Sequence, residues 1–147
     1  MKTMTEYDPN IDEQLIFDRT QADIINRTPL KFAGDYVMLN RIENACLFMS
    51  EQLGLHLVCK EWEPEDWRYQ SEMDRIKNNI NTIRESYFVD PTTPATPSSI
   101  TLSSYTQANN VEKILYDLVT RRKSDVSGMH RFPFKLGMRT FGNSYRR

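Results

Sequence analysis

The feature that most constrains this chain is a regular apolar stripe within residues 70–88. Its members recur at steps of three and four positions, which places them on one side of an α-helix. They are Met73, Ile76, Ile80, Ile83 and Tyr87. A helix with so narrow a stripe is not stable alone in water, so the pattern predicts a helix that packs against another apolar surface. We expect that surface to be the protein's own core rather than a second chain.

Residues 36–53 show the same spacing, with a wider apolar stripe. Asp35 precedes the segment as its natural N-cap, and Gly54 follows it where a left-handed residue commonly ends a helix. The stripe consists of Leu39, Ile42, Cys46, Met49 and Leu53. The pattern predicts the most buried helix of the protein.

Residues 106–123 form the third segment of this kind. Thr106 is its expected N-cap, and Glu112 and Lys113 are expected on its outward side. Its stripe consists of Ala108, Val111, Leu115, Leu118 and Val119. The basic residues that end the segment suit the negative end of a helix dipole.

The remainder of residues 1–123 connects these helices. A short N-terminal helix is expected within residues 20–27, capped by Asp18 or Thr20. Residues 55–62 are rich in β-formers, which predicts a strand or an extended connector. Residues 89–104 contain three prolines and many hydroxyl side chains, which predicts a strap across the surface. The sequence therefore predicts a mainly α fold, a small helical bundle of three long helices plus a short N-terminal helix.

Residues 124–147 lose the helical spacing and alternate apolar with polar or basic side chains. This pattern predicts an extended or β-like C-terminal arm. So short an arm has little core of its own, and it could find its partner strand or groove on another subunit. The residues expected to bind that partner are Phe132, Phe134, Leu136, Met138, Arg139, Phe141 and Tyr145.

The charge of the chain is unevenly distributed. Residues 121–147 hold eight basic side chains and a single acidic one, Asp125, so their net charge is +7. Because the whole chain carries −1, the first 120 residues sum to −8. A basic end could bind a polyanion such as a nucleic acid. It could equally pack against the acidic surface of its own body or of a neighbouring copy.

Two tryptophans, Trp62 and Trp67, enclose an acidic turn. Together they could form a surface aromatic patch that stacks on a sugar or binds a partner. Alternatively, their rings could hold the loop against the core, which is the commoner use of such residues.

The sequence nominates no catalytic residue, metal ligand or cofactor site. His56 and His130 stand in unrelated settings, and the five glycines are scattered rather than gathered in a phosphate-binding loop. Cys46 and Cys59 lie in segments expected to be buried, where reduced packing residues are usual. We therefore expect a protein without enzymatic activity.

The sequence contains no apolar run near the roughly 20 residues that cross a bilayer. Its first residues also lack the apolar core of a signal peptide. We therefore expect synthesis in the cytoplasm, with no membrane as a partner.

Several segments, in their order along the chain, resemble a group of small structural proteins from the tail modules of phages and prophages of Firmicutes. The matching segments are residues 18–24, 39–53, a tryptophan-rich stretch, 70–88 and 103–118, of which the last is the most specific. The aromatic and glycine pattern that is typical of the group's C-terminus is echoed by Phe134, Gly137, Phe141 and Gly142.

This resemblance implies a virion component of the tail tip or baseplate, or one that attaches fibres. Its partners would be other tail, baseplate or fibre proteins, and the symmetry of tails implies a homo-oligomer with threefold or sixfold arrangement. It implies no reaction and no cofactor. The alternative from the residues themselves is a nucleic-acid-binding accessory protein that uses the basic arm.

Overall fold

A computed structural model describes residues 2–29, 31, 33–87, 89–102 and 104–131, and within them the protein is mainly helical. A 3-10 turn, η1 (Ile11–Glu13), precedes the short helix α1 (Gln21–Ile25). The three long helices are α2 (Tyr36–Leu53), α3 (Gln70–Ser86) and α4 (Tyr105–Arg131). The prediction of three long helices and a short N-terminal one is confirmed, and the expected β-like arm from residue 132 onward lies outside the described residues.

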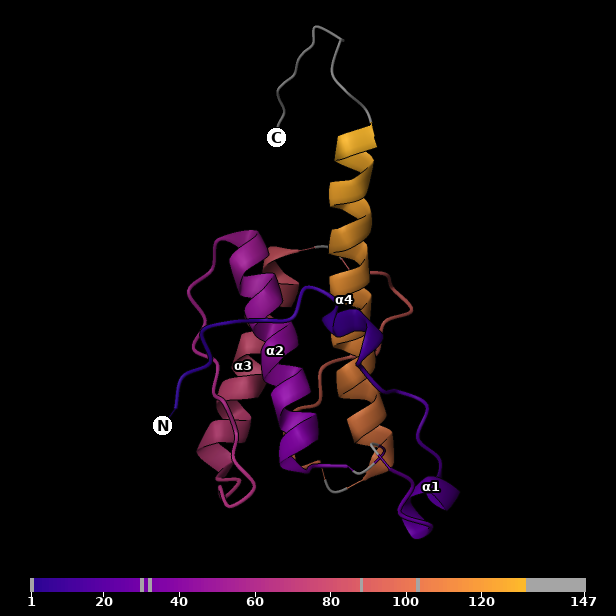
Figure 1. Cartoon of the computed structure of the whole chain (residues 1–147). Coiled ribbons are helices and arrows are strands. Elements are labelled where there is room, and N and C mark those ends of the chain that lie inside the picture. Colours follow the sequence, from indigo (N-terminus) through magenta and orange to yellow (C-terminus); the bar gives the residue numbers. More distant parts are fainter. Residues whose placement is uncertain (1, 30, 32, 88, 103, 132–147) are drawn as a thin grey trace, which may run out of the picture.

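The three long helices run in the same direction, with their N-terminal ends together at the lower end in Figure 1. Residues 54–69 and 87–104 each return along the length of the body to begin the next helix. Apolar spacing carries no information on direction, so the sequence could not distinguish this parallel arrangement from an alternating one.

The ends of α2 are those that the sequence predicts. Asp35 Oδ1 accepts a hydrogen bond of 2.9 Å from the Met38 amide, and Gly54 ends the helix in the left-handed region with φ of 69°. The predicted cap of α4 is wrong by two positions. Ser104 Oγ, not Thr106, accepts a hydrogen bond of 3.1 Å, which the Gln107 amide donates.

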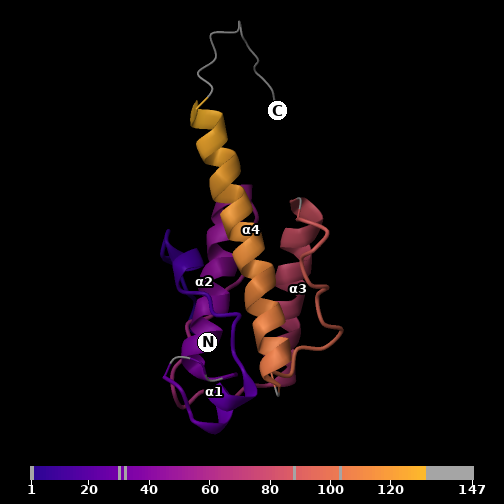
Figure 2. The ribbon, with the colours of Figure 1, turned by 90° about the vertical axis from the view of Figure 1, so that its right-hand side faces the viewer.

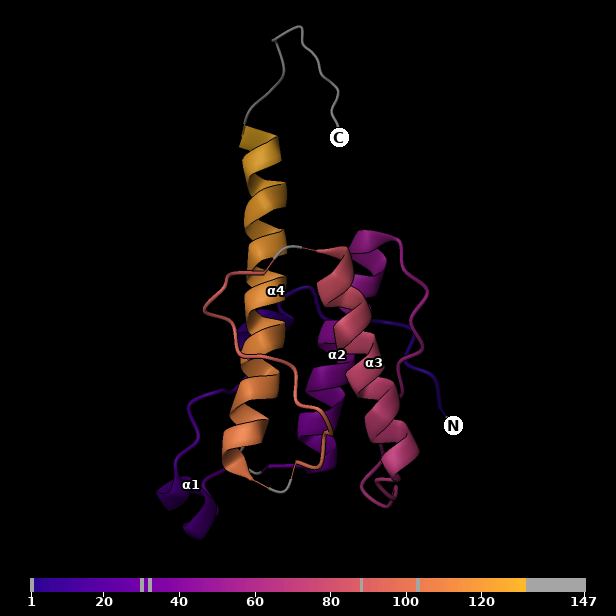
Figure 3. The same ribbon diagram turned by 180° about the vertical axis from the view of Figure 1, so that it is seen from behind.

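Helix α2 lies at the centre of the body and contacts both α3 and α4. Residues 89–102 cross the face between α3 and α4, as Figures 2 and 3 show. The predicted strap thus lies across the surface, but it also contributes to the core, because Ile100 and Leu102 are buried. The largest fully buried side chains on the three long helices are Met38, Leu39, Ile42, Met49, Ile76, Ile80, Ile83, Ile114 and Leu115.

Residues 55–62 are an extended connector. A single antiparallel bridge joins Lys60 to Thr3, and the Met4 amide donates a hydrogen bond of 2.8 Å to the Cys59 carbonyl. Within the described residues this pairing is limited to one bridge and forms no β-strand. The N-terminal segment therefore lies against the connector and helps to hold it on the body.

The predicted boundary between body and arm at residue 124 is wrong. Residues 124–131 continue α4 as a helix, and the end of α4 projects beyond α2 and α3 (Figures 1 and 2). Two contacts explain part of this extension. Arg121 pairs with Asp125 one turn later, with 3.2 Å between nitrogen and oxygen, and the Tyr87 hydroxyl donates to Asp125 Oδ2. Such pairs at i and i+4 favour a helix.

Candidate assembly surfaces

A buried ionic cluster of Arg19, Arg41 and Glu112 joins three parts of the body. Arg41 Nε donates a hydrogen bond of 3.0 Å to Glu112 Oε1, and Arg19 donates to the other carboxylate oxygen. The Ile16 amide completes the set by donating to Glu112 Oε1 at 3.1 Å. Glu112 is thus buried, and the expectation that it faces outward is wrong. The cluster attaches the N-terminal segment to α2 and α4.

A second cluster fixes the position of Trp62. Its indole Nε1 donates a hydrogen bond of 2.8 Å to the buried carboxylate of Glu43, which also accepts one of 2.9 Å from Arg75. The Lys60 ammonium lies 3.9 Å from the centre of the Trp62 ring, close enough for a cation–π contact. Only 2% of Trp62 is exposed. Trp62 therefore holds the connector against the core.

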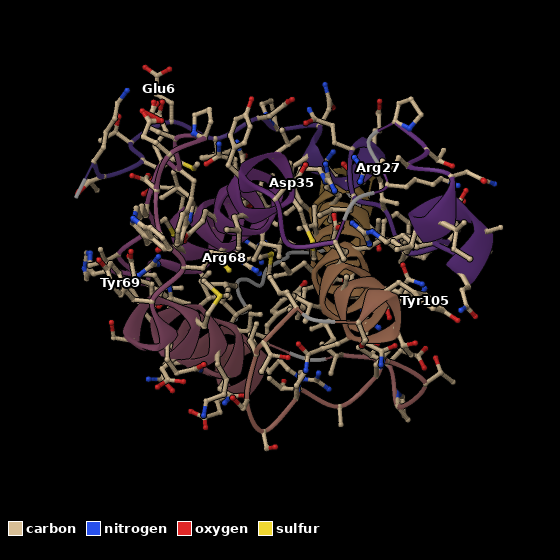
Figure 4. All side chains as sticks on the ribbon, turned by 90° about the horizontal axis from the view of Figure 1, so that it is seen from below. Glu6, Arg27, Asp35, Arg68, Tyr69 and Tyr105 are labelled. Carbon is tan, nitrogen blue, oxygen red and sulfur yellow. The ribbon has the colours of Figure 1, made fainter. Side chains whose placement is uncertain are left out.

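Trp67 lies in the opposite environment, with 76% of its surface exposed. Of the two alternatives for the tryptophans, a surface patch made by both is therefore excluded, because Trp62 is buried while Trp67 is exposed. The alternative of a ring that holds the loop against the core applies to Trp62. The chain instead places Trp67 beside Arg68 and Tyr69, and 62% of Tyr69 is exposed. Figure 4 shows Arg68 and Tyr69 at the end of the body where the long helices begin. Trp, Tyr and Arg are the residue types that most often dominate protein interfaces.

The loop that carries these side chains is acidic. Residues 61–69 hold Glu61, Glu63, Glu65 and Asp66 against Arg68, a net charge of −3. Glu61 pairs with Lys2 at 3.2 Å, and Asp66 lies 3.9 Å from Lys60. Among the described residues, Glu63 and Glu65 form no ion pair. We refer to residues 61–69 as the acidic aromatic loop.

The far end of α4 is basic, but its first cations are already held by the body. Arg122 donates a hydrogen bond of 3.2 Å to the Gln52 side chain, and Lys123 Nζ lies 2.6 Å from Asp12 Oδ1. For these two residues the basic end packs on its own body, which is one of the alternatives that the sequence left open. Beside them is a hollow of about 370 Å³ lined by Phe48, Gln52, Arg122, Lys123, Val126 and Ser127.

The residues that the sequence nominated for partner binding lie beyond Arg131 and outside the described residues. They are Phe132, Phe134, Leu136, Met138, Arg139, Phe141 and Tyr145. The structure nevertheless fixes where this arm leaves the body, because α4 ends at Arg131, at the end opposite the acidic aromatic loop.

Comparison with protein families, curated proteins and solved structures finds no match.

The described residues offer little for chemistry at a buried site. No group of three or more His, Cys, Asp or Glu side chains within them is arranged to hold a metal ion. Burial raises the pKa of the Cys59 thiol to about 12 and that of Cys46 well above its ordinary value. Thiols that stay protonated are poor nucleophiles. Among these same residues no helix has both the length and the apolar character needed to cross a membrane.

Proposed function

We propose that this protein is a structural component of a bacteriophage tail that acts by protein–protein assembly at the tail tip, the baseplate or the fibre attachment. The observation that carries the proposal is the projection of α4 beyond the body, so that the chain leaves the helix at Arg131, away from the core (Figure 1). The body supplies a rigid block, and the arm supplies the attachment to a neighbour.

The buried clusters support the part of the proposal that concerns rigidity. Glu112 receives hydrogen bonds from Arg19 and Arg41, which lie on separate elements, and Glu43 similarly unites Trp62 with Arg75. A buried ion pair specifies one arrangement of the elements, because a lone buried charge is costly. A subunit that holds its neighbours at defined positions in an assembly needs a body whose elements keep one arrangement.

The end of α4 at Arg131 and the acidic aromatic loop lie at opposite ends of the body, which supports an assembly of several copies. A contact between different surfaces of the same protein forms a ring when the rotation closes, and tails have threefold or sixfold symmetry. The proposed partners are further copies of this chain and neighbouring tail, baseplate or fibre proteins. The choice of a phage tail rests on the ordered sequence segments that resemble tail-module proteins.

Nucleic-acid binding through the arm is the weaker candidate. Arg122 and Lys123 are engaged with Gln52 and Asp12, so the helical part of the basic segment has little charge left for phosphates. The cations that would remain are Arg131 and the four of residues 132–147. Binding to DNA that weakens steeply with added salt would favour this candidate.

The proposal is tested on purified particles of the phage whose genome encodes this chain. Quantitative mass spectrometry should detect the protein in intact virions, at a copy number divisible by three for each tail. Antibodies against exposed positions of the body should label the tail end in electron micrographs. Absence of the protein from washed particles would overturn the proposal.

A further inference from the structure

We propose that the receptor for the arm is the acidic aromatic loop of the next copy, so that residues 132–147 of one copy dock on residues 61–69 of another. This inference rests on the proposed function and adds to it the surface that receives the arm. The acidic aromatic loop lies at the end of the body where the long helices begin, and α4 ends at Arg131 at the opposite end (Figure 1).

The charges of the two segments are complementary. Residues 132–147 carry four basic side chains and no acidic one, whereas residues 61–69 carry a net charge of −3. Within the described chain, Glu63 and Glu65 form no ion pair, although the pKa of Lys2 is raised by its hydrogen bond to Glu61 and also by the nearby charge of Glu63. Opposite potentials on two surfaces guide their encounter and select the correct orientation.

The side chains of the loop are suited to bind an aromatic segment. Trp67 and Tyr69 expose most of their surface, although rings of this size are usually covered in a folded protein. Arg68 stands between them in the sequence. Its guanidinium packs against Gly34, since a β-carbon added to that glycine would lie only 2.6 Å from Arg68 Nη1. The arm offers matching rings and cations. Its aromatic residues are Phe132, Phe134, Phe141 and Tyr145.

The length of the arm favours a neighbouring copy over its own loop. Helix α4 has 27 residues and is therefore about 40 Å long. The sixteen residues of 132–147 span at most about 53 Å when fully extended. An arm that returned to the level of its own loop would use roughly twelve residues on the path, leaving about four to bind. An arm that reaches a copy placed beyond Arg131 keeps nearly all of its residues for contact.

The resulting interface joins two different surfaces, so each copy both gives an arm and receives one. Copies related in this way continue until the rotation closes into a ring. This geometry predicts a specific behaviour when one of the two surfaces is disabled. A copy without a functional arm can still bind the arm of another copy through its loop. A copy without a functional loop can still insert its own arm into the loop of another copy.

The test uses two variants of the full chain. The arm variant carries Lys135→Glu and Arg139→Glu, and the loop variant carries Glu65→Lys and Trp67→Ala. A control variant carries Glu51→Lys and Ile25→Ala, which change an exposed carboxylate and an exposed apolar side chain away from the loop. Light scattering after size exclusion measures the mass of each species, and circular dichroism checks that every variant is folded.

The wild type and the control should form oligomers, whereas each disabled variant alone should be monomeric at the same concentration. An equimolar mixture of the two variants should yield a 1:1 dimer, because one intact arm meets one intact loop. If the loop variant assembles like the wild type, the arm docks elsewhere and this inference is overturned, while a role in the tail stands. A wild type that stays monomeric up to about 1 mM, the concentration at which an association worth roughly 4 kcal/mol is half complete, also overturns it.

Discussion

Arg19 and Glu112 meet inside the protein although 93 positions separate them in the sequence, and both side chains are fully buried. Arg41 shares the same carboxylate, so a single negative charge balances two positive ones. The short N-terminal segment thus depends on α4 for its position.

Replacement of Glu112 by Gln should therefore destabilise the fold strongly. The side chain keeps its size, but two buried guanidinium groups lose their counter-charge, and the expected loss is about 3–5 kcal/mol of unfolding free energy. Urea unfolding followed by circular dichroism measures it. Glu13→Gln, at an exposed position, is the matched control and should change stability by less than about 0.5 kcal/mol. A loss below about 1 kcal/mol for Glu112→Gln would contradict the structural role of the cluster.

The two tryptophans should respond in opposite ways to removal of their rings. Trp62→Ala creates a cavity and leaves Glu43 without its indole donor, so we expect a loss of about 3–5 kcal/mol. Trp67→Ala removes an exposed ring and should cost less than about 0.5 kcal/mol. Thermal and urea unfolding measure both. Equal losses for the two variants would show that the ring of Trp67 is also part of the core.

Gly54 provides a test of the helix end. Its φ of 69° lies in the left-handed region, and a Cβ at this position would meet no atom within 4 Å. Gly54→Ala therefore adds conformational strain without a clash, and the expected cost is about 1 kcal/mol. The midpoint of urea unfolding measures this cost. A neutral substitution would mean that α2 ends differently in solution.

The buried thiols predict a loss of stability in alkaline solution. In the unfolded chain Cys59 ionises near its ordinary pKa of 9.0, whereas burial raises the folded value to about 12. The contribution of this thiol to stability is fully present below pH 9 and falls as the pH rises from 9 to 12, by up to about 1.4 kcal/mol per pH unit. Unfolding in urea at a series of pH values measures the decline. Cys59→Ala should make the decline less steep and leave the part that is due to Cys46, and an unchanged slope in that variant would refute the assignment.

The sequence predicted those parts of the fold that depend on local spacing. The bounds of α2 match the predicted 36–53, and α3 (Gln70–Ser86) covers the predicted segment 70–88 except for its last two positions. Its N-cap is Tyr69 rather than Gln70 or Ser71, which the sequence favours as caps. The extension of α4 to Arg131 was missed because its apolar stripe thins after Val119, although no proline interrupts the helix there. A pair such as Tyr87 and Asp125 maintains that extension and leaves no local signal in the sequence.

The burial of polar residues was the second feature that the sequence could not predict. Helical spacing places Glu112 on the buried stripe, four positions after Ala108 and three before Leu115, but its charge led to the expectation that it faces outward. Only its distant partners Arg19 and Arg41 explain how a carboxylate is accommodated there. The same limit applies to the tryptophans, since only the position of Glu43 distinguishes the buried Trp62 from the exposed Trp67. For the arm, the sequence supplies its charge and aromatic content, and the structure supplies the direction in which α4 delivers it.

The most direct test of an arm that joins copies is its deletion at the end of the helix. A chain that stops at Arg131 keeps α4 and its contacts with Asp12 and Gln52. Light scattering and circular dichroism are measured on this variant and on the full chain at equal concentration. The account predicts that the full chain forms oligomers and that the shortened chain is a folded monomer with the same molar helicity. Oligomers of unchanged mass after the deletion would contradict it.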